Sequence, residues 1–259
     1  MNKEQLKESL HNWVKNNYNL NNYKVKEKLE HTYYVADNAL ELAKSLQFTI
    51  NDQNLAYILG ILHDFGRFEQ VTNQNNYVDF KGFDHAEMGA KYLFDDGLIS
   101  LFNVDKKDYN LLNQCIRQHN KLSIDKSITD TKTIIFSKLI RDADKLDMYR
   151  LNSESTNHLT LNLAGYTEEV LNSIYNNKCV NVKHRKTLLD EILGFLGTIF
   201  DLNYEYSKQN LYKTNFFNNF YNNYQHLLTN KDKTVLKNAI NYVNGQLQQA
   251  NNKKMHIKN

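Results

Sequence analysis

The sequence predicts an all-α protein. Apolar residues recur at helical spacing along almost the whole chain, and no convincing run of alternating polar and apolar residues indicates a strand. None of the 259 residues is proline, so the predicted helices lack the interruption that proline imposes. The expected helices cover about residues 3–17, 27–47, 52–65, 84–96, 107–120, 132–151, 167–177, 183–210, 213–227 and 231–250.

Apolar residues that share one helix face support these helices in order. The stripes are Val35, Ala39, Leu42 and Leu46; Leu55, Leu59 and Leu62; Met88, Gly89 and Tyr92; Leu112, Cys115 and Ile116; and Ile140 with Ala143. Aromatic residues in "LLDEILGFLGTIFDLNYEYSKQN" and "NFFNNFYNNYQHLL" follow the same spacing, which is typical of a buried core.

Several predicted helix ends carry residues that suit a cap. Asp84 followed by Glu87 predicts a capping box at the start of one helix. Asp52 and Thr167 are expected to be N-caps of two others. Gly66 suits the left-handed conformation that commonly follows a helix end.

Charge and cysteine content restrict the classes of function. The 32 Lys and Arg residues nearly balance the 29 Asp and Glu residues, so we expect no nucleic acid polymer and no membrane surface as a partner. The two cysteines, Cys115 and Cys179, are too few for a disulfide framework and are consistent with a reducing compartment. The N-terminus lacks the apolar run of a signal peptide, so the expected location is cytoplasmic.

Four histidines, each on a different predicted helix, continue the apolar stripe of that helix. They are His31, His63, His85 and His119. A single histidine of this kind is more often a hydrogen-bonded core residue than a metal ligand. Four together, with Asp64 beside His63 and with Asp144 on a helix that has buried neighbours, indicate a metal site instead.

These residues resemble the H…HD…D signature of the HD superfamily of metal-dependent phosphohydrolases. The matching residues are His31, His63, Asp64 and Asp144. The segments "FDHAEMGAKYLF" and "IRQHNK" are similar to the segments that carry two extra histidines in two-metal members of the family. The resemblance covers roughly residues 25–150 and implies a helical core, which agrees with the helical spacing.

The domain organisation follows from this resemblance. We expect residues 1–150 to form an HD-type catalytic core with the N-terminal helix packed on it. Residues 151–259 are expected to be a helical extension that completes the same compact unit, with a disordered tail near 251–259.

The resemblance also implies two ion positions. The first ion would be held by His31, His63, Asp64 and Asp144. Asp64 would bridge to a second ion held by His85 and His119. Imidazoles mixed with carboxylates suit Mn, Fe, Co, Ni or Zn rather than Ca or Mg. Asp142 and Asp147 could each orient a ligand histidine, or one of them could protonate a leaving group; the orienting role is the expected one.

Three cations beside the ligand motifs are candidates for binding a phosphate group. Arg67 lies in the long predicted loop 66–83, and Lys121 and Lys145 follow His119 and Asp144 closely. Asp64, Arg67 and Lys145 are the expected catalytic residues. The ligand and phosphate-binding residues together need no serine or cysteine nucleophile, because two ions can activate a shared water.

The predicted function is a phosphohydrolase that acts on a small phosphorylated metabolite, with a nucleotide expected, either as a phosphomonoesterase or as a phosphodiesterase. Two alternatives use the same ligands. The first is a di-iron oxygenase of the HD type, and the second is a nucleotide-binding HD module without turnover. The sequence predicts no particular oligomeric state.

Overall fold

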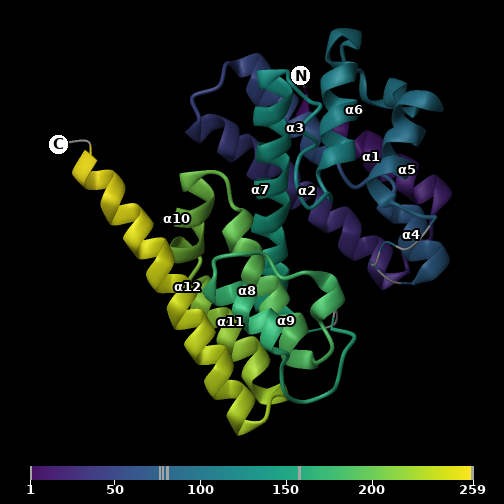
Figure 1. Cartoon of the computed structure of the whole chain (residues 1–259). Helices are drawn as coiled ribbons and strands as arrows, with labels where there is room; N and C mark the ends of the chain where they lie inside the picture. Colours follow the sequence, from purple (N-terminus) through teal and green to yellow (C-terminus); the bar gives the residue numbers. More distant parts are fainter. Residues whose placement is uncertain (1, 76, 78, 80–81, 157–158, 258–259) are drawn as a thin grey trace. The chain divides into compact units, whose positions relative to one another are not determined.

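The computed structural model describes residues 2–75, 77, 79, 82–156 and 159–257, with side chains described as far as residue 249 (Figure 1). The described residues contain no β-strand, which confirms the all-α prediction. The chain divides into two compact units, Met1–Asp147 and Met148–Asn259. Whether the two parts complete one compact unit stays a prediction.

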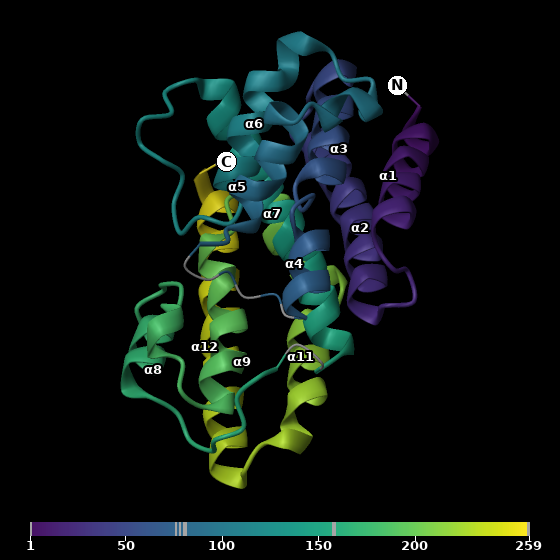
Figure 2. The same ribbon diagram turned by 90° about the vertical axis from the view of Figure 1, so that its right-hand side faces the viewer.

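The first unit consists of helices around a helix pair that packs along its length. Its elements are α1 (Lys3–Asn17), α2 (Tyr23–Ser45), α3 (Ile50–Leu62), α4 (Arg67–Gln74), α5 (His85–Ala90), the π-helix η1 (Lys91–Asp95), the 3-10 helices η2 (Leu98–Phe102) and η3 (Lys106–Asp108), α6 (Tyr109–Gln118) and most of α7 (Thr131–Glu154). Helices α2 and α3 lie side by side (Figure 2). A Cβ on Gly60 would lie 2.4 Å from the Cα of Ala36, so the glycine permits this close approach.

Helix α1 packs against the turn that follows α3. The indole ring of Trp13 stacks on Phe65 with a centroid separation of 3.9 Å and meets the edge of Phe68 at 6.1 Å. Both phenylalanines are buried. The N-terminal helix therefore supports the backbone at residues 63–66, where the His-Asp doublet lies.

The second unit has a core of aromatic side chains. Its elements are α8 (Glu168–Tyr175), η4 (Val182–His184), α9 (Leu188–Gly197), η5 (Thr198–Asp201), α10 (Glu205–Lys213), α11 (Phe216–Tyr224), η6 (Gln225–Leu227) and α12 (Asn230–Ile257). Helix α12 packs against α8, α9 and α11. Helix α11 buries three aromatic side chains at helical spacing, Phe216, Phe220 and Tyr224. The hydroxyl of Tyr224 donates a hydrogen bond to Asn152 Oδ1 at 2.7 Å. The aromatic stripe is therefore core, as its spacing predicts.

Two predicted elements are wrong. The single helix expected over 183–210 is instead α9 and α10, separated by a 3-10 turn and by extended backbone at Leu202 and Tyr204. The Asn203 side chain donates to the Asp201 carbonyl, a local hydrogen bond that competes with helix continuation. The loop expected over 66–83 contains α4, whose apolar residues are buried.

The cap predictions have mixed outcomes. Asp84 is the N-cap of α5, and its carboxylate accepts from the backbone N–H groups of Ala86 and Glu87. Asp52 does not cap α3, because Thr49 occupies the N-cap and accepts from the Asp52 N–H. Thr167 lies at the N-cap of α8 without a capping hydrogen bond.

The end of the chain differs from the expected disordered tail, since α12 continues to Ile257. Residues 258 and 259 of that predicted tail lie outside the described residues. None of the described helices combines the length and the apolar character that crossing a bilayer requires.

Candidate metal centre

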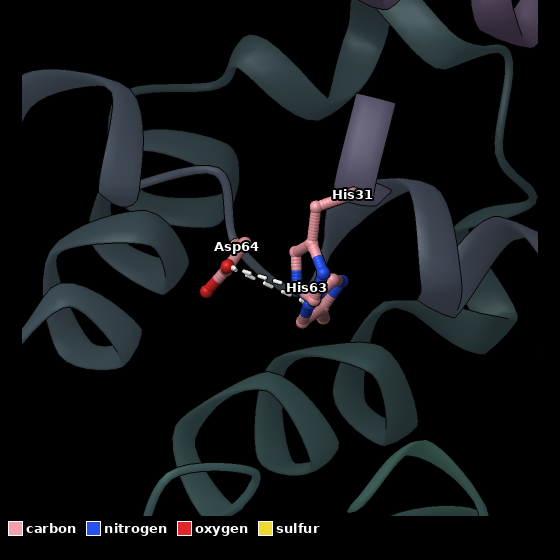
Figure 3. A group of neighbouring side chains, drawn as sticks. All are labelled: His31, His63 and Asp64. Atoms are coloured by element: carbon pink, nitrogen blue, oxygen red, sulfur yellow. Dashed lines mark ion pairs between the residues drawn. The ribbon is translucent and has the colours of Figure 1, made fainter. Parts of the chain in front are cut away.

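The first unit brings the six predicted ligands together. His31 lies on α2, His63 and Asp64 follow α3, His85 opens α5, His119 follows α6, and Asp144 lies on α7. The four histidines and Asp64 are buried, and the side chain of Asp144 is 22% exposed. Figure 3 shows His31 and His63 converging beside Asp64. Ligands from five separate segments of chain thus face one centre.

The His63–Asp64 doublet lies in a tight turn between α3 and α4. The Phe65 N–H donates to the Leu62 carbonyl and the Arg67 N–H donates to the Asp64 carbonyl. Consecutive helical side chains diverge by about 100°, and this turn lets both members of the doublet face the same centre. The doublet therefore stands where the α3 backbone leaves its helix.

Gly66 serves this turn for a different reason from the predicted one. Its φ of −78° and ψ of −12° are right-handed, so the predicted left-handed conformation is wrong. A Cβ at this position would lie 2.2 Å from the His85 carbonyl oxygen and 2.7 Å from the Gly89 nitrogen. Gly66 is needed because the backbone of α5 lies against it, which keeps His85 close to the doublet.

Each of the four imidazoles is oriented by a hydrogen bond from its Nδ1. His63 donates to the Gly60 carbonyl and His119 donates to the Ile116 carbonyl, each at 2.7 Å. The other two imidazoles donate to carboxylates, His31 to Asp147 at 2.7 Å and His85 to Asp79 at 2.8 Å. Because an acceptor fixes one proton on Nδ1, the Nε2 of each imidazole in its neutral form presents a lone pair to the centre.

Asp64 faces two pairs of imidazoles with its two carboxylate oxygens. Its Oδ2 lies 3.6 Å from His31 Nε2 and 3.7 Å from His63 Nε2. Its Oδ1 lies 3.4 Å from His85 Nε2 and 3.5 Å from His119 Nε2. Each pair forms with Asp64 a group whose ligand atoms all lie within 4.8 Å of one another. The carboxylate therefore stands between two groups of ligand atoms, each of which could hold a metal ion.

Asp144 contacts only the first of these pairs among the described interactions. Its Oδ1 lies 3.2 Å from His31 Nε2 and 4.0 Å from His63 Nε2. The first position thus offers four protein ligands, whereas the second offers His85, His119 and the shared Asp64.

The donor set fits divalent cations. His31 Nε2 and His63 Nε2 are buried and have no hydrogen-bond partner among the described residues, which is costly for polar atoms unless a cation binds them. The Nε2 atoms of His85 and His119 are 3.0 Å apart. That separation suits two neighbouring ligands of one ion at the usual metal–nitrogen distance of about 2.1 Å.

The pKa values of His63, His85 and Asp64 favour the ligand forms of these groups, whereas the pKa of His31 is raised, because its contacts with Asp144 and Asp147 outweigh burial and the charge of Lys28. Burial lowers the pKa of His63 to about 4, and burial together with the charge of Arg67 lowers that of His85 to about 4. Burial alone would raise the pKa of Asp64, but Lys28 together with His63, His119 and Arg67 outweighs burial and holds that pKa well below its usual range. Near neutral pH the imidazoles of His63 and His85 are therefore neutral and the carboxylate of Asp64 is ionised.

The three predicted phosphate-binding cations are already engaged with protein groups. Arg67 Nη1 donates to the Tyr77 carbonyl at 2.8 Å and lies 3.4 Å from Asp79. Lys121 pairs with the Asp84 carboxylate. Lys145 is buried, and its Nζ donates to the Arg141 carbonyl of its own helix at 3.2 Å. Their catalytic and substrate roles stay predictions.

Two residues near the centre are not predicted from the sequence. Asp79 binds His85 Nδ1 through both carboxylate oxygens, and with Asp84 and His85 it forms a third group of closely spaced ligand atoms. Lys28 lies one helical turn before His31, and its Nζ is 3.4 Å from Asp64 Oδ2. The spacing of three residues on one helix is a signal that could have identified Lys28. Asp79 lies in a loop without periodicity, so no such signal exists for it.

Fold and site together define an all-α protein with a buried centre of imidazoles and carboxylates that can hold divalent metal ions. Residues 29–149 match the family model of the HD domain. This segment of the chain is therefore an HD domain, as its resemblance to the HD superfamily of metal-dependent phosphohydrolases predicts. Comparison with the curated proteins and with the solved structures gave no match.

Proposed function

We propose that the protein is a metal-dependent phosphohydrolase that cleaves a phosphoester of a small phosphorylated metabolite, with nucleotides as the expected class. The observation that carries this proposal is the position of Asp64, whose two oxygens face different pairs of imidazoles. Two divalent cations bound there would supply an activated water and polarise the phosphoryl group. The HD domain supports the same chemistry, since this family generally consists of hydrolases.

The residues of the chain would hold these cations and the substrate in place. The ligands at the first position are His31, His63, Asp64 and Asp144, and those at the second are Asp64, His85 and His119. The mixture of imidazole and carboxylate suits Mn, Fe, Co, Ni or Zn. Asp147 and Asp79 would keep the imidazoles of His31 and His85 in the ligand tautomer.

Positive charge beside the cluster favours an anionic substrate. Lys28 Nζ lies 3.4 Å from one oxygen of Asp64, and Arg67 Nε lies 3.5 Å from the other. Positive charge this close to the cluster attracts an anionic group such as phosphate. The di-iron oxygenase and the binding module without turnover would use the same ligands, and the experiment below separates them from the hydrolase.

The test combines metal analysis with an activity screen. Purified protein loaded with manganese or cobalt is assayed for metal content, and for release of phosphate or nitrophenol from nucleotides, p-nitrophenyl phosphate and bis(p-nitrophenyl) phosphate. We expect two ions per chain and hydrolysis that proceeds without oxygen. Asp64→Ala should lose both, and His119→Ala should lose one ion. Asp96→Ala, which alters an exposed ion pair with Lys91, should change neither.

Three results would overturn the proposal. An Asp64→Ala variant with full metal content and turnover would remove the mechanism. Oxygen consumption with a mixed-valent iron signal, together with no phosphoester cleavage, would establish the oxygenase. Tight nucleotide binding without cleavage of any ester in the panel would establish the binding module.

A further inference from the structure

Lys28 is a mostly covered cation that lies beside the metal centre. It lies on α2, one helical turn before His31, so both side chains project from the same face of the helix. Its side chain is only 13% exposed, and its Nζ lies 3.4 Å from Asp64 Oδ2. That oxygen is the one that faces His31 and His63, so the ammonium lies at the first ion position.

The aromatic ring of Tyr77 holds the ammonium group of Lys28 beside Asp64. Its Nζ lies 5.0 Å from the ring centre of Tyr77, a distance at which a cation is attracted to an aromatic face. The Tyr77 hydroxyl donates to the Glu27 carboxylate, which fixes the ring against α2. Lys24 approaches the same ring at 5.6 Å, but its Nζ donates to the Asn75 carbonyl. Of these two lysines, only Lys28 contacts a residue of the centre.

The hydrogen-bonding capacity of Lys28 is largely unused. An ammonium group can donate three hydrogen bonds. Within the described part of the chain, its one acceptor is Asp64 Oδ2, and the contact of 3.4 Å is long for a charge-assisted bond. Arg67, in contrast, has three acceptors for Nη1 alone, namely Gln70, Tyr77 and Asp79.

The positive charge of Lys28 also requires an anionic partner when metal ions occupy the centre. Asp64 neutralises this mostly covered ammonium, but in the proposed function the same carboxylate is shared between two divalent cations. A lysine held against such a centre would be repelled by it, because both carry positive charge in a poorly solvated place. An anion that contacts both the cations and the ammonium removes this repulsion.

We propose that Lys28 binds a phosphoryl oxygen of the substrate on the Oδ2 side of Asp64, a role that rests on the proposed function. In this arrangement Arg67 is a positioning residue, which holds Asp79 and the Tyr77 backbone beside the second ion position. The phosphoryl contact and the orientation of the ligands are then made by different cations.

The experiment uses inorganic phosphate as the probe, titrated by calorimetry into the full chain loaded with manganese or cobalt. Lys28→Met keeps the length and apolar body of the side chain and removes its charge. We expect it to bind phosphate about tenfold to a hundredfold more weakly than the wild type, since one charge-assisted hydrogen bond is lost. Its metal content should equal or exceed that of the wild type, because a repelling charge is removed. Lys28→Arg should restore part of the affinity.

Lys24→Met is the matched control, because it removes a charge one turn earlier on α2 that lies over the same Tyr77 ring. It should bind phosphate as the wild type does. Wild-type phosphate affinity in Lys28→Met would overturn the inference, and so would a loss of metal in parallel with a loss of phosphate. If phosphate binding depends on Lys28 but no phosphoester is hydrolysed, the inference stands and the proposed function fails.

Discussion

Replacement of Gly66 by alanine should destabilise the protein through a steric clash and not through backbone strain. Its right-handed φ and ψ suit alanine, but the new Cβ would lie 2.2 Å from the His85 carbonyl oxygen and 2.7 Å from the Gly89 nitrogen. Both neighbours are backbone atoms of α5, so that helix must shift. Overpacking of this kind costs about 1–3 kcal/mol, which corresponds to a fall in Tm of about 2–12 °C.

The shift would also disturb the second ion position. His85 Nε2 lies 3.4 Å from Asp64 Oδ1, and metal sites tolerate errors of only about 0.5 Å. Thermal unfolding of Gly66→Ala, with metal analysis of the same sample, measures both effects. Gly245→Ala is the control, because no described atom lies within 4 Å of the Cβ that alanine would add there, and it should be neutral or slightly stabilising.

Two outcomes would refute this reasoning about Gly66. A Gly66→Ala protein with the Tm and metal content of the wild type would show that the backbone of α5 is not in close contact with Gly66. Stability that is lost in Gly66→Ala but kept in Gly66→Asn would indicate a left-handed backbone, because asparagine tolerates that conformation and has a larger side chain.

Two further predictions concern hydrogen bonds of the first unit. Asp147→Asn should weaken metal binding at the position of His31 about tenfold to a hundredfold, because the imidazole loses its charged acceptor. Metal titration of the variant measures this affinity, and an unchanged affinity would exclude an orienting role for Asp147. The second concerns the pKa of Asp52. Burial alone would raise that pKa, but the hydrogen bonds from Lys132 and Thr49 together with the charge of Lys132 outweigh burial and lower the value below 3.8. The ion pair between Asp52 and Lys132 therefore stabilises the fold above pH 3.8, and this stabilisation is lost as the pH falls through the lowered pKa of Asp52. The Tm difference between wild type and Asp52→Asn should shrink from pH 6 to pH 3. A constant Tm difference would contradict this role of the ion pair.

The clustering of the four histidines can be predicted from the sequence because each of them obeys two independent patterns. His31, for example, continues an apolar helix face and also occupies the first place of an ordered motif. Helical periodicity determines that a side chain points inward, and the order of the motif determines its neighbours. Convergence from five segments then follows from the fold of the family.

Other features depend on tertiary contacts that leave no local pattern. Gly66 is one example. A glycine can be required by a left-handed turn or by a close approach of another backbone segment, and the sequence shows the same glycine in both cases. Asp79 is another, because its role comes from a contact with His85 that no periodicity of the sequence predicts. The break at Leu202 is not predicted because the aromatic spacing continues on both sides of it.

The hydrogen bonds of the imidazoles have a consequence for how this centre can change over evolutionary time. At each ion position, one histidine is anchored by a main-chain carbonyl three residues earlier, Gly60 or Ile116, and the other by an acidic side chain, Asp147 or Asp79. Point mutations cannot delete a main-chain oxygen, so the two main-chain anchors survive any substitution of Gly60 or Ile116 that leaves the helix intact. The two acidic anchors remain open to mutation, one for each ion, and selection could adjust the two affinities separately.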